Sequence, residues 1–201
     1  MNISDLLKNK DKFEELLFNI IVKYGRKYKG IDRLIKLSNK ASTIYCYVIN
    51  VSKKPFPEKE DIIAQDEAYS FYYAKNILKG KFEKGEEVIS KSAEYSFYYA
   101  RDVLKNRFEK GEEAISKSEF YSFHYAQNIL KDRFEEGEEV ISKSGYYSFR
   151  YAKNILKGRF KKGEEAIIKD KKVLKEYMKF LKKSGRLDEF LKDYPKIKLE
   201  N

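Results

Sequence analysis

Cysteine, histidine and proline are scarce in this chain of 201 residues, which has one cysteine, one histidine and three prolines. A single cysteine, Cys46, cannot form an internal disulfide, and this indicates a reducing compartment. One cysteine and one histidine also fall short of the Cys/His set that a structural zinc site requires. Ten glycines and three prolines are too few for a disordered chain or for a fold with many tight β-turns.

Long apolar runs are missing as well. No run approaches the roughly 18–20 residues that a membrane-spanning helix needs. The first residues carry charges where a signal peptide would be apolar. We therefore expect a soluble cytoplasmic protein that makes no membrane contact.

Positive charge is in excess, but it is unevenly placed. The net charge of +11 comes from residues 1–66 (+4), 145–170 (+4) and 171–201 (+5), whereas residues 67–144 carry −2. A continuous stripe for nucleic acid would spread the cations more evenly along the chain. Any basic binding surface is therefore expected near the ends.

Residues 67–170 repeat one pattern four times. The first copy reads EAYSFYYAKNILKGKFEKGEEVISKS, and Phe82, Phe108, Phe134 and Phe160 mark a period of 26 residues. A fixed period of this size is typical of stacked helical repeats. Residues 41–66 fit the same pattern as a degenerate copy. In that copy Pro57 falls at the first helical position, where its missing N–H costs nothing.

The fold class that follows is all-α. We predict a right-handed α-solenoid of helix-turn-helix repeats, forming one continuous domain with helical caps at both ends, because one hairpin cannot close a core without its neighbours. The segments are an N-terminal helical cap (1–40), five repeats within 41–170 (41–66, 67–92, 93–118, 119–144 and 145–170) and C-terminal capping helices (171–201).

Each repeat predicts a long helix, a tight turn and a short helix. Good N-caps precede the long helices, at Asp66, Ser92, Ser118, Ser144 and Asp170. Ser4 is expected to cap the first helix of the chain. The residues expected to end the long helices in a left-handed conformation are Gly80, Asn106, Asp132 and Gly158. Gly85 and its equivalents lie within the short helix and predict a close helix crossing where no Cβ fits.

No catalytic constellation is visible, so we expect a protein that is not an enzyme and needs no cofactor or metal. His124 and Cys46 share one repeat position, and the sequence places no partner group beside them. The pair Glu86–Glu87, which recurs in each clear repeat, is explained by the dipole of the short helix and by an i,i+4 pair with Lys91. Adjacent carboxylates point apart on a helix and would not hold one metal ion.

Two rows of cations follow the long helices. They are Lys79, Lys105, Lys131 and Lys157, and then Lys81, Arg107, Arg133 and Arg159. Helix dipoles favour cations at these ends. A basic ridge that follows an acidic surface or a phosphate backbone would require the same residues. Both interpretations stay open.

The positions that differ between near-identical repeats are the candidates for partner binding. They lie on the solvent side of the long helix and comprise Tyr72, Tyr98, His124 and Arg150, with Lys75, Arg101 and Lys153 beside them. A further variable series is Ala68, Glu94, Phe120 and Tyr146. Aromatic and arginine side chains suit a protein hot spot or base stacking. Mutational drift on an unused surface would explain the variation equally well.

The pattern Y-S-F-x-Y-A-x-N-I-L-K-G-x-F followed by G-E-E-x-I resembles short helical-hairpin repeats of phage, viral and uncharacterised bacterial proteins. The resemblance covers residues 67–170 well and 41–66 weakly. It implies an α-solenoid and an origin in a mobile element, and that group has no agreed activity. The repeats are also similar in logic to tetratricopeptide and Sel1-like helix pairs, whose periods are longer and whose signature residues are absent here.

These observations favour a non-catalytic module that binds a protein partner, such as a phage-type factor that binds or inhibits a host protein. The alternative is binding to a nucleic-acid backbone through the basic C-terminal end. Its candidate contacts are Lys172, Lys175, Lys179, Lys182 and Lys183, with Lys161, Lys162, Lys169 and Lys171 nearby. Self-assembly through the ends of the repeat array is a third possibility.

Overall fold

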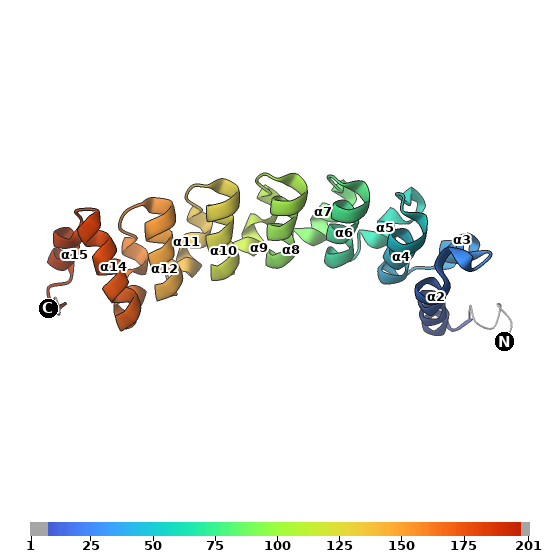
Figure 1. Cartoon of the computed structure of the whole chain (residues 1–201), viewed down its shortest axis with the longest axis horizontal. Helices are drawn as coiled ribbons and strands as arrows, with labels where there is room; N and C mark the ends of the chain where they lie inside the picture. The colour runs from blue at the N-terminus through green and yellow to red at the C-terminus, as the bar shows by residue number, and fades with distance from the viewer. Residues whose placement is uncertain (1–7, 198–201) are drawn as a thin grey trace. The chain divides into compact units, whose positions relative to one another are not determined.

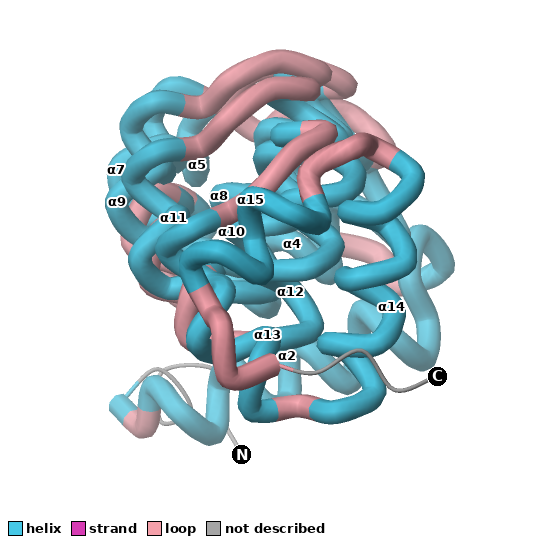
Figure 2. Tube along the Cα trace, turned by 90° about the vertical axis from the view of Figure 1, so that its left-hand side faces the viewer, coloured by secondary structure: helices cyan, strands magenta, loops and turns pink. Residues whose placement is uncertain are grey.

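The computed structural model describes residues 8–197, and every regular element within that range is helical. Figures 1 and 2 show helices joined by loops, and the described part of the chain has no strand. This confirms the all-α class. The chain divides into two compact units, Met1–Gly111 (unit 1) and Glu112–Asn201 (unit 2), which are described separately. The prediction of one continuous domain stays a prediction.

Unit 1 places its long helices side by side in chain order (Figure 1). Helix α4 contacts α6, α6 contacts α8, and the N-terminal α2 packs on α4. The short helices α5 and α7 pack against α6. The bounds of the α-helices are α2 (Lys10–Tyr24), α3 (Ile31–Leu34), α4 (Ala41–Tyr47), α5 (Glu60–Ile63), α6 (Glu67–Tyr73), α7 (Glu86–Ile89) and α8 (Ala93–Tyr98).

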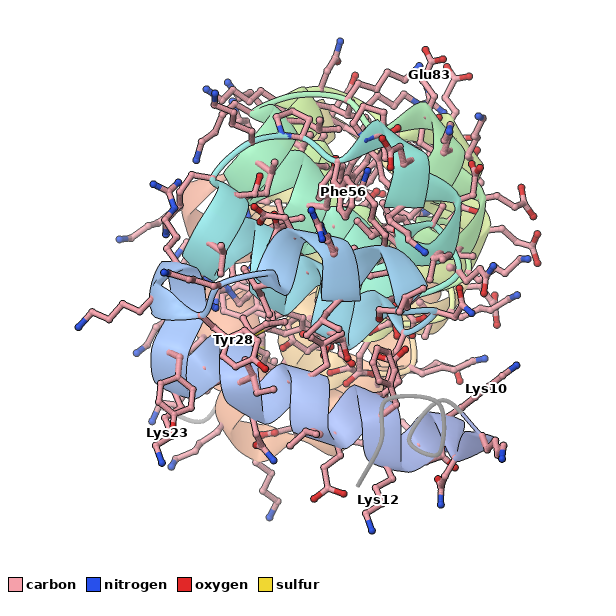
Figure 3. The ribbon with its side chains drawn as sticks, turned by 90° about the vertical axis from the view of Figure 1, so that its right-hand side faces the viewer. Lys10, Lys12, Lys23, Tyr28, Phe56 and Glu83 are labelled. Atoms are coloured by element: carbon pink, nitrogen blue, oxygen red, sulfur yellow. The ribbon has the colours of Figure 1, made fainter. Side chains whose placement is uncertain are left out.

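The N-terminal helix is fixed to unit 1 by a buried carboxylate. Glu14 of α2 is only 8% exposed. It accepts hydrogen bonds from the Ser38 hydroxyl at 2.7 Å and from the Asn39 N–H at 2.8 Å. Figure 3 shows Lys10, Lys12 and Lys23 pointing outward. Phe56 is partly exposed, and its ring centroid is 5.9 Å from that of Tyr47. The predicted helical cap packs onto the first repeat, because α2 contacts α4.

Unit 2 follows the same plan. Helix α10 contacts α12, α12 contacts α14, and the short helices α11 and α13 pack against them. The bounds are α9 (Glu112–Ile115), α10 (Glu119–Tyr125), α11 (Glu135–Ile141), α12 (Gly145–Tyr151), α13 (Glu164–Lys169), α14 (Lys171–Lys183) and α15 (Leu187–Asp193). Helix α15 packs on α14 and completes the C-terminal cap.

The predicted N-caps of the repeats are confirmed. The Asp66 carboxylate accepts from the Tyr69 N–H at 2.9 Å, and Ser92 and Ser118 accept from Tyr95 and Tyr121 in the same way. Ser144 and Asp170 cap α12 and α14 likewise. Ser4 lies outside the described residues. Helix α2 is capped by Asn9, which accepts from the Lys12 N–H.

The predicted ends of the long helices were wrong by one residue. The left-handed residue is a lysine in every repeat, with φ between 50° and 58°, at Lys53, Lys79, Lys105, Lys131 and Lys157. The cause is a π-helical last turn, such as Ala74–Leu78, in which both Lys79 and Gly80 donate their N–H to the Ala74 carbonyl. The widened turn places the reversal of the chain one position earlier than predicted. Gly80 itself does not have a positive φ.

The predicted close crossing at Gly85 is confirmed. The short segment opens with a 3₁₀ turn, Glu83–Gly85, and Gly85 lies where this turn meets α7. A Cβ built on Gly85 would lie 2.7 Å from the Ser70 Cβ and 2.5 Å from a ring carbon of Phe82. Ser70 occupies the facing helix and is fully buried, and its hydroxyl donates to the Ile63 carbonyl. The two backbones can therefore approach only because both residues are small.

A buried carboxylate–tyrosine pair links each hairpin to the next long helix. The tyrosine hydroxyl donates to a glutamate 13 residues earlier, in the pairs Tyr73–Glu60 (3.1 Å), Tyr99–Glu86 (3.4 Å), Tyr125–Glu112 (2.8 Å), Tyr151–Glu138 (3.2 Å) and Tyr177–Glu164 (2.8 Å). These five tyrosines are fully buried. The same hydroxyl accepts the N–H of the phenylalanine that starts the short segment, as Tyr99 accepts from Phe82 at 2.9 Å.

We call each carboxylate–tyrosine pair a rung. Cations compensate the charge of its carboxylate. Glu138 is 1% exposed and receives Arg133 from its own repeat at 2.8 Å and Lys162 from the next repeat at 3.3 Å. Glu86 similarly receives Lys81 and Lys110. A buried charge needs such partners, since it would otherwise carry an uncompensated desolvation cost. The first glutamate of each Glu-Glu pair is thus a core residue, whereas the second makes the predicted surface pair, as in Glu87–Lys91 at 3.2 Å.

Within the described residues, no helix is long and apolar enough to cross a membrane.

Candidate functional site

The exposed side of the long helices in unit 1 carries a continuous group of rings. Tyr45 lies 5.6 Å from Tyr69 and 6.2 Å from Tyr72 between ring centroids, and Tyr72 lies 6.4 Å from Tyr95. Tyr72 is 40% exposed, and Tyr45, Tyr69, Tyr95 and Tyr98 are partly exposed. Helical spacing produces this group, because positions i and i+3 share a face and neighbouring helices bring their rows together. We call these five tyrosines the aromatic face of unit 1.

Two predicted cations of unit 1 share a single carboxylate. Lys75 lies 2.7 Å from Asp102 and Arg101 lies 2.5 Å from it. The hydrogen bond from Arg101 is the main reason that the pKa of Asp102 falls to about 2, and Lys75 adds to the effect. The Arg101 guanidinium also lies 4.8 Å from the ring centroid of Tyr98. Two cations and one carboxylate therefore leave this part of the face with one net positive charge.

Unit 2 carries a different set on the equivalent positions. The rings of Phe120 and His124 are 4.4 Å apart between centroids. Arg150 lies 5.2 Å from the centroid of Phe123 and donates to the Tyr146 hydroxyl at 2.6 Å. Burial, and then the nearby Arg150, lower the pKa of His124. Phe120 and Tyr146 are 43% and 51% exposed. Phe120, His124, Tyr146 and Arg150 form the aromatic face of unit 2.

The structure groups the predicted partner-binding residues by unit. Tyr72, Tyr98, Lys75 and Arg101 lie on the face of unit 1, and His124 and Arg150 lie on that of unit 2. Lys153 lies 5.8 Å from the centroid of Phe149. Sequence reasoning missed the tyrosines that are the same in every clear repeat, such as Tyr69 and Tyr95, because they lie on the apolar arc of the helix. Their partial exposure adds area to the face.

The predicted anion contacts lie on α14. Lys172, Lys175, Lys179, Lys182 and Lys183 are exposed along this helix, and Lys179 pairs with Glu176 at 2.8 Å. Two of the nearby lysines already pair with carboxylates of the protein, since Lys161 pairs with Glu189 and Asp193, and Lys162 pairs with Glu138. The basic surface at this end is therefore narrower than the sequence indicates.

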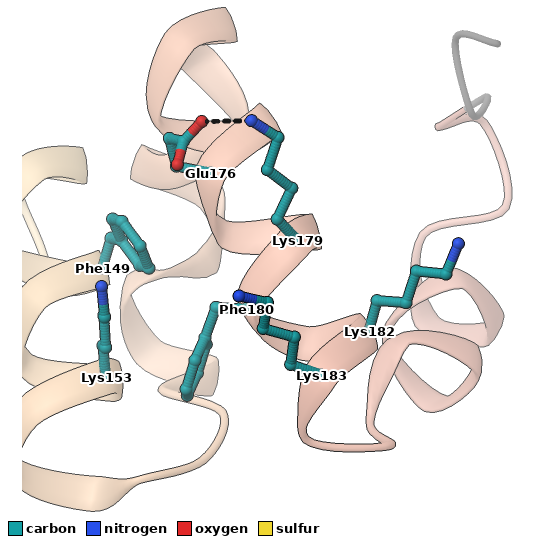
Figure 4. A pocket seen from close by; sticks show the side chains of 7 residues that line it. All are labelled: Phe149, Lys153, Glu176, Lys179, Phe180, Lys182 and Lys183. Atoms are coloured by element: carbon teal, nitrogen blue, oxygen red, sulfur yellow. Dashed lines mark hydrogen bonds and ion pairs between the residues drawn. The ribbon is translucent and has the colours of Figure 1, made fainter.

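A hollow of about 330 Å³ lies beside these lysines, between α14 and the end of α12 (Figure 4). Two phenylalanine rings and four lysines dominate its lining, which comprises Phe149, Lys153, Glu176, Lys179, Phe180, Lys182 and Lys183. The two rings are 6.2 Å apart between centroids and inclined by 55°. Figure 4 shows Lys153 beside Phe149 and Lys183 turned toward Phe180, while Lys182 points away.

Of the two rows of cations that follow the long helices, the second row mainly stabilises the fold. Lys81, Arg133 and Arg159 pair with the buried carboxylates Glu86, Glu138 and Glu164. Arg159 is nearly enclosed, with a side chain only 4% exposed, and it also reaches Glu189 and Asp193 of α15. The first row, by contrast, is exposed and has the left-handed conformation described above.

Residues with metal-binding or nucleophilic chemistry do not converge in the described part of the chain, where no group of three or more His, Cys, Asp or Glu side chains is placed to hold a metal ion. Cys46 is 8% exposed, and burial raises the pKa of its thiol, which disfavours the reactive thiolate. No family model, curated protein or solved structure matches this chain.

Proposed function

We propose that this protein is a non-catalytic module that binds a protein partner through the aromatic faces of its long helices. The observation that carries the proposal is the presence of half-exposed rings with cations stacked on them, as in Tyr146 with Arg150 and Tyr98 with Arg101. Tyrosine and arginine dominate the binding energy of protein interfaces, because they combine a large apolar area with a polar end.

The architecture that we infer for this module is a right-handed α-solenoid. Within each unit, successive hairpins are joined by the same contact, the rung, and each clear repeat closes on itself at the glycine crossing. Repeats that seal only on their neighbours build a long surface and no central pocket. Solution scattering tests this, since a solenoid has a maximum dimension much greater than that of a compact protein of 201 residues.

The partner that fits these faces is a segment with apolar and acidic side chains, because the faces offer rings together with Lys75, Arg101 and Arg150. The resemblance to phage repeats extends the proposal to a host protein as the partner. The exposed positions vary between repeats while the interior does not, so successive hairpins present different side chains to different parts of one partner.

The test is a comparison of three purified proteins: the wild type, a Tyr72→Ala/Arg150→Ala variant and a control. The control, Lys91→Ala/Lys117→Ala, changes lysines whose side chains are 68% and 70% exposed on the short segments. We expect a partner from the native host to bind the wild type and the control, and to bind the face variant at least tenfold more weakly by calorimetry. Equal binding by all three proteins would exclude the aromatic faces as the site.

A second candidate function is binding to a nucleic-acid backbone, favoured by the lysines of α14. They recur every three or four residues, about 4.5–6 Å along the helix at 1.5 Å per residue. Each lysine that neutralises a phosphate releases a counterion, so the affinity must fall steeply as salt rises. A mobility-shift assay with generic DNA and RNA tests this function. Binding at low salt that is lost at moderate salt would support it. No shift at low salt would exclude it.

A further inference from the structure

The hollow beside α14 is lined by a phenylalanine that is more exposed than its equivalent in the preceding repeat. Phe123 of the preceding repeat is fully buried, with Tyr147 at 5.6 Å and Arg150 at 5.2 Å from its ring. Phe149 is the same residue one period later and is partly exposed. The residue one period after Arg150 is Glu176, which lines the hollow. A carboxylate therefore stands where the preceding repeat has the guanidinium that stacks on its phenylalanine.

The open space is bordered by positive charge. Lys153 reaches it from the turn that follows α12, and Lys179 and Lys183 reach it from α14, while Lys182 lines it with its amine turned away. One carboxylate, Glu176, opposes them, and it is already paired with Lys179 at 2.8 Å. A ligand group that fits here is therefore flat and apolar against the two phenylalanine rings and negatively charged beside the lysines.

We propose that this hollow binds single-stranded nucleic acid, with a base packed on Phe149 and Phe180 and the phosphates on the lysines of α14. The inference rests on the second candidate function and adds a preference for unpaired strands, because a base inside a duplex has no free face. Base stacking on an aromatic side chain stabilises single-strand binding and tolerates every base, because each base has an aromatic face.

A single strand suits the site better than an acidic peptide does. Each nucleotide supplies one ring and one negative charge, which matches a pair of rings beside a row of lysines. An extended peptide advances about 3.3 Å per residue and would need an acidic residue at nearly every second position as well as an aromatic one. Lysine also binds phosphate well as a compact point charge.

The first experiment measures fluorescence anisotropy with a labelled oligothymidylate and with a duplex of the same length. We expect the wild type to bind the single strand at least tenfold more tightly than the duplex. Phe180→Leu keeps an apolar side chain but removes the ring, and it should weaken single-strand binding about fivefold or more while leaving the salt dependence unchanged. The matched control is Phe18→Leu, since Phe18 is 39% exposed on α2 of unit 1.

A second variant removes the other ring of the hollow. Phe149→Leu takes away the ring whose centroid is 6.2 Å from that of Phe180, so it should also weaken single-strand binding and reduce the preference for single strands. This variant keeps the inference testable if Phe180→Leu folds poorly. Lys182→Gln/Lys183→Gln should lower the affinity for both oligonucleotides and reduce the slope of affinity against salt concentration.

The outcomes separate this inference from the function on which it rests. Equal affinity for single strand and duplex, lowered by the lysine variant but not by the two ring variants, would overturn the base-binding hollow and leave backbone binding in place. No binding at low salt would overturn both. Displacement of the oligothymidylate by a Glu/Tyr copolymer of the same charge would assign the hollow to a protein segment and overturn the inference.

Discussion

Residues inside each hairpin stay the same from one repeat to the next, whereas residues on the exposed side of its long helix change. The rung keeps the same tyrosine in five successive copies, from Tyr73 to Tyr177, whereas the exposed series changes from Tyr72 to His124 to Arg150. A rung contains a carboxylate that is at most 6% exposed in the four clear repeats, so the loss of a partner leaves a buried charge that is less well compensated. The exposed side has no such requirement and is free to specialise for a partner.

The largest effect that we expect on this interior is a loss of folding stability at high pH, to which all the rungs contribute together. Burial raises the pKa of Tyr73 to about 12, with nearby Glu60 contributing, and burial likewise raises the pKa of Tyr99, Tyr151 and Tyr177. The unfolded chain has tyrosine pKa values near 10. Between the two values the folded state binds more protons than the unfolded state, so stability is complete below about pH 10 and falls as pH rises through about 12.

Thermal melting between pH 9 and pH 12, followed with tyrosinate absorbance, measures this loss. We expect exposed tyrosines to ionise near pH 10 and the rung tyrosines to ionise only together with the loss of helical circular dichroism. Ionisation of all tyrosines in a chain that remains fully helical would contradict the role of the rungs.

A single rung can also be tested by removing the cation that pairs with its carboxylate. Arg159→Met removes a side chain that is 4% exposed and leaves Glu164, which is fully buried, without its guanidinium. We expect a loss of about 3 kcal/mol in the free energy of unfolding of unit 2, by urea denaturation. Arg133→Met is the matched control, because Arg133 is 50% exposed and Glu138 keeps Lys162, and it should cost less than about 1 kcal/mol. Equal losses would show that burial does not decide the effect.

The close crossing of unit 1 can be tested with a pair of glycines from one repeat. Gly85→Ala forces a Cβ against Ser70 and Phe82 and should destabilise the unit by about 1–3 kcal/mol. Gly80→Ala meets only a carbonyl oxygen at 3.9 Å, and it should be neutral or stabilise by up to about 1 kcal/mol. Both are measured by thermal melting. Similar melting temperatures for the two variants would contradict the crossing.

The smallest expected effect concerns the left-handed lysines. Lys131 has φ 55°, a conformation that costs a residue with a Cβ about 1 kcal/mol. Lys131→Gly should therefore stabilise unit 2 by about 0.5–1 kcal/mol, whereas Lys179→Gly, within α14, should destabilise it by about 1 kcal/mol. Urea denaturation of both variants checks the opposite signs. Destabilisation by Lys131→Gly would show that the lysine side chain has a role that outweighs the strain.

The period, the N-caps and the crossing at Gly85 could be predicted because they depend on local residues and on spacing. The burial of Glu86 could not, since Glu86 and Glu87 look alike in sequence. The partners that distinguish them, Tyr99 and Lys110, lie 13 and 24 residues away. The helix ends were misplaced for a similar reason, because a π-helical turn has no composition signal and moves the reversal onto a lysine.

The candidate site was predictable only in part. Exposure of Tyr72 and Arg150 follows from the helical wheel, but the shared carboxylate Asp102 joins cations from two helices and has no local signature. The hollow brings Phe149 and Lys153 together with Phe180 and the lysines of α14, and no local pattern in either segment indicates that they meet.

The rungs also determine how such a gene can grow or shrink. Each carboxylate receives its hydroxyl from the following copy, so excising or duplicating one whole 26-residue block rejoins a carboxylate to an equivalent tyrosine. A deletion that is not a multiple of 26 residues separates them and leaves a charge in the core. We therefore expect recombination between copies to preserve the pairing, provided that the terminal helix with Tyr177 is retained to satisfy the last carboxylate.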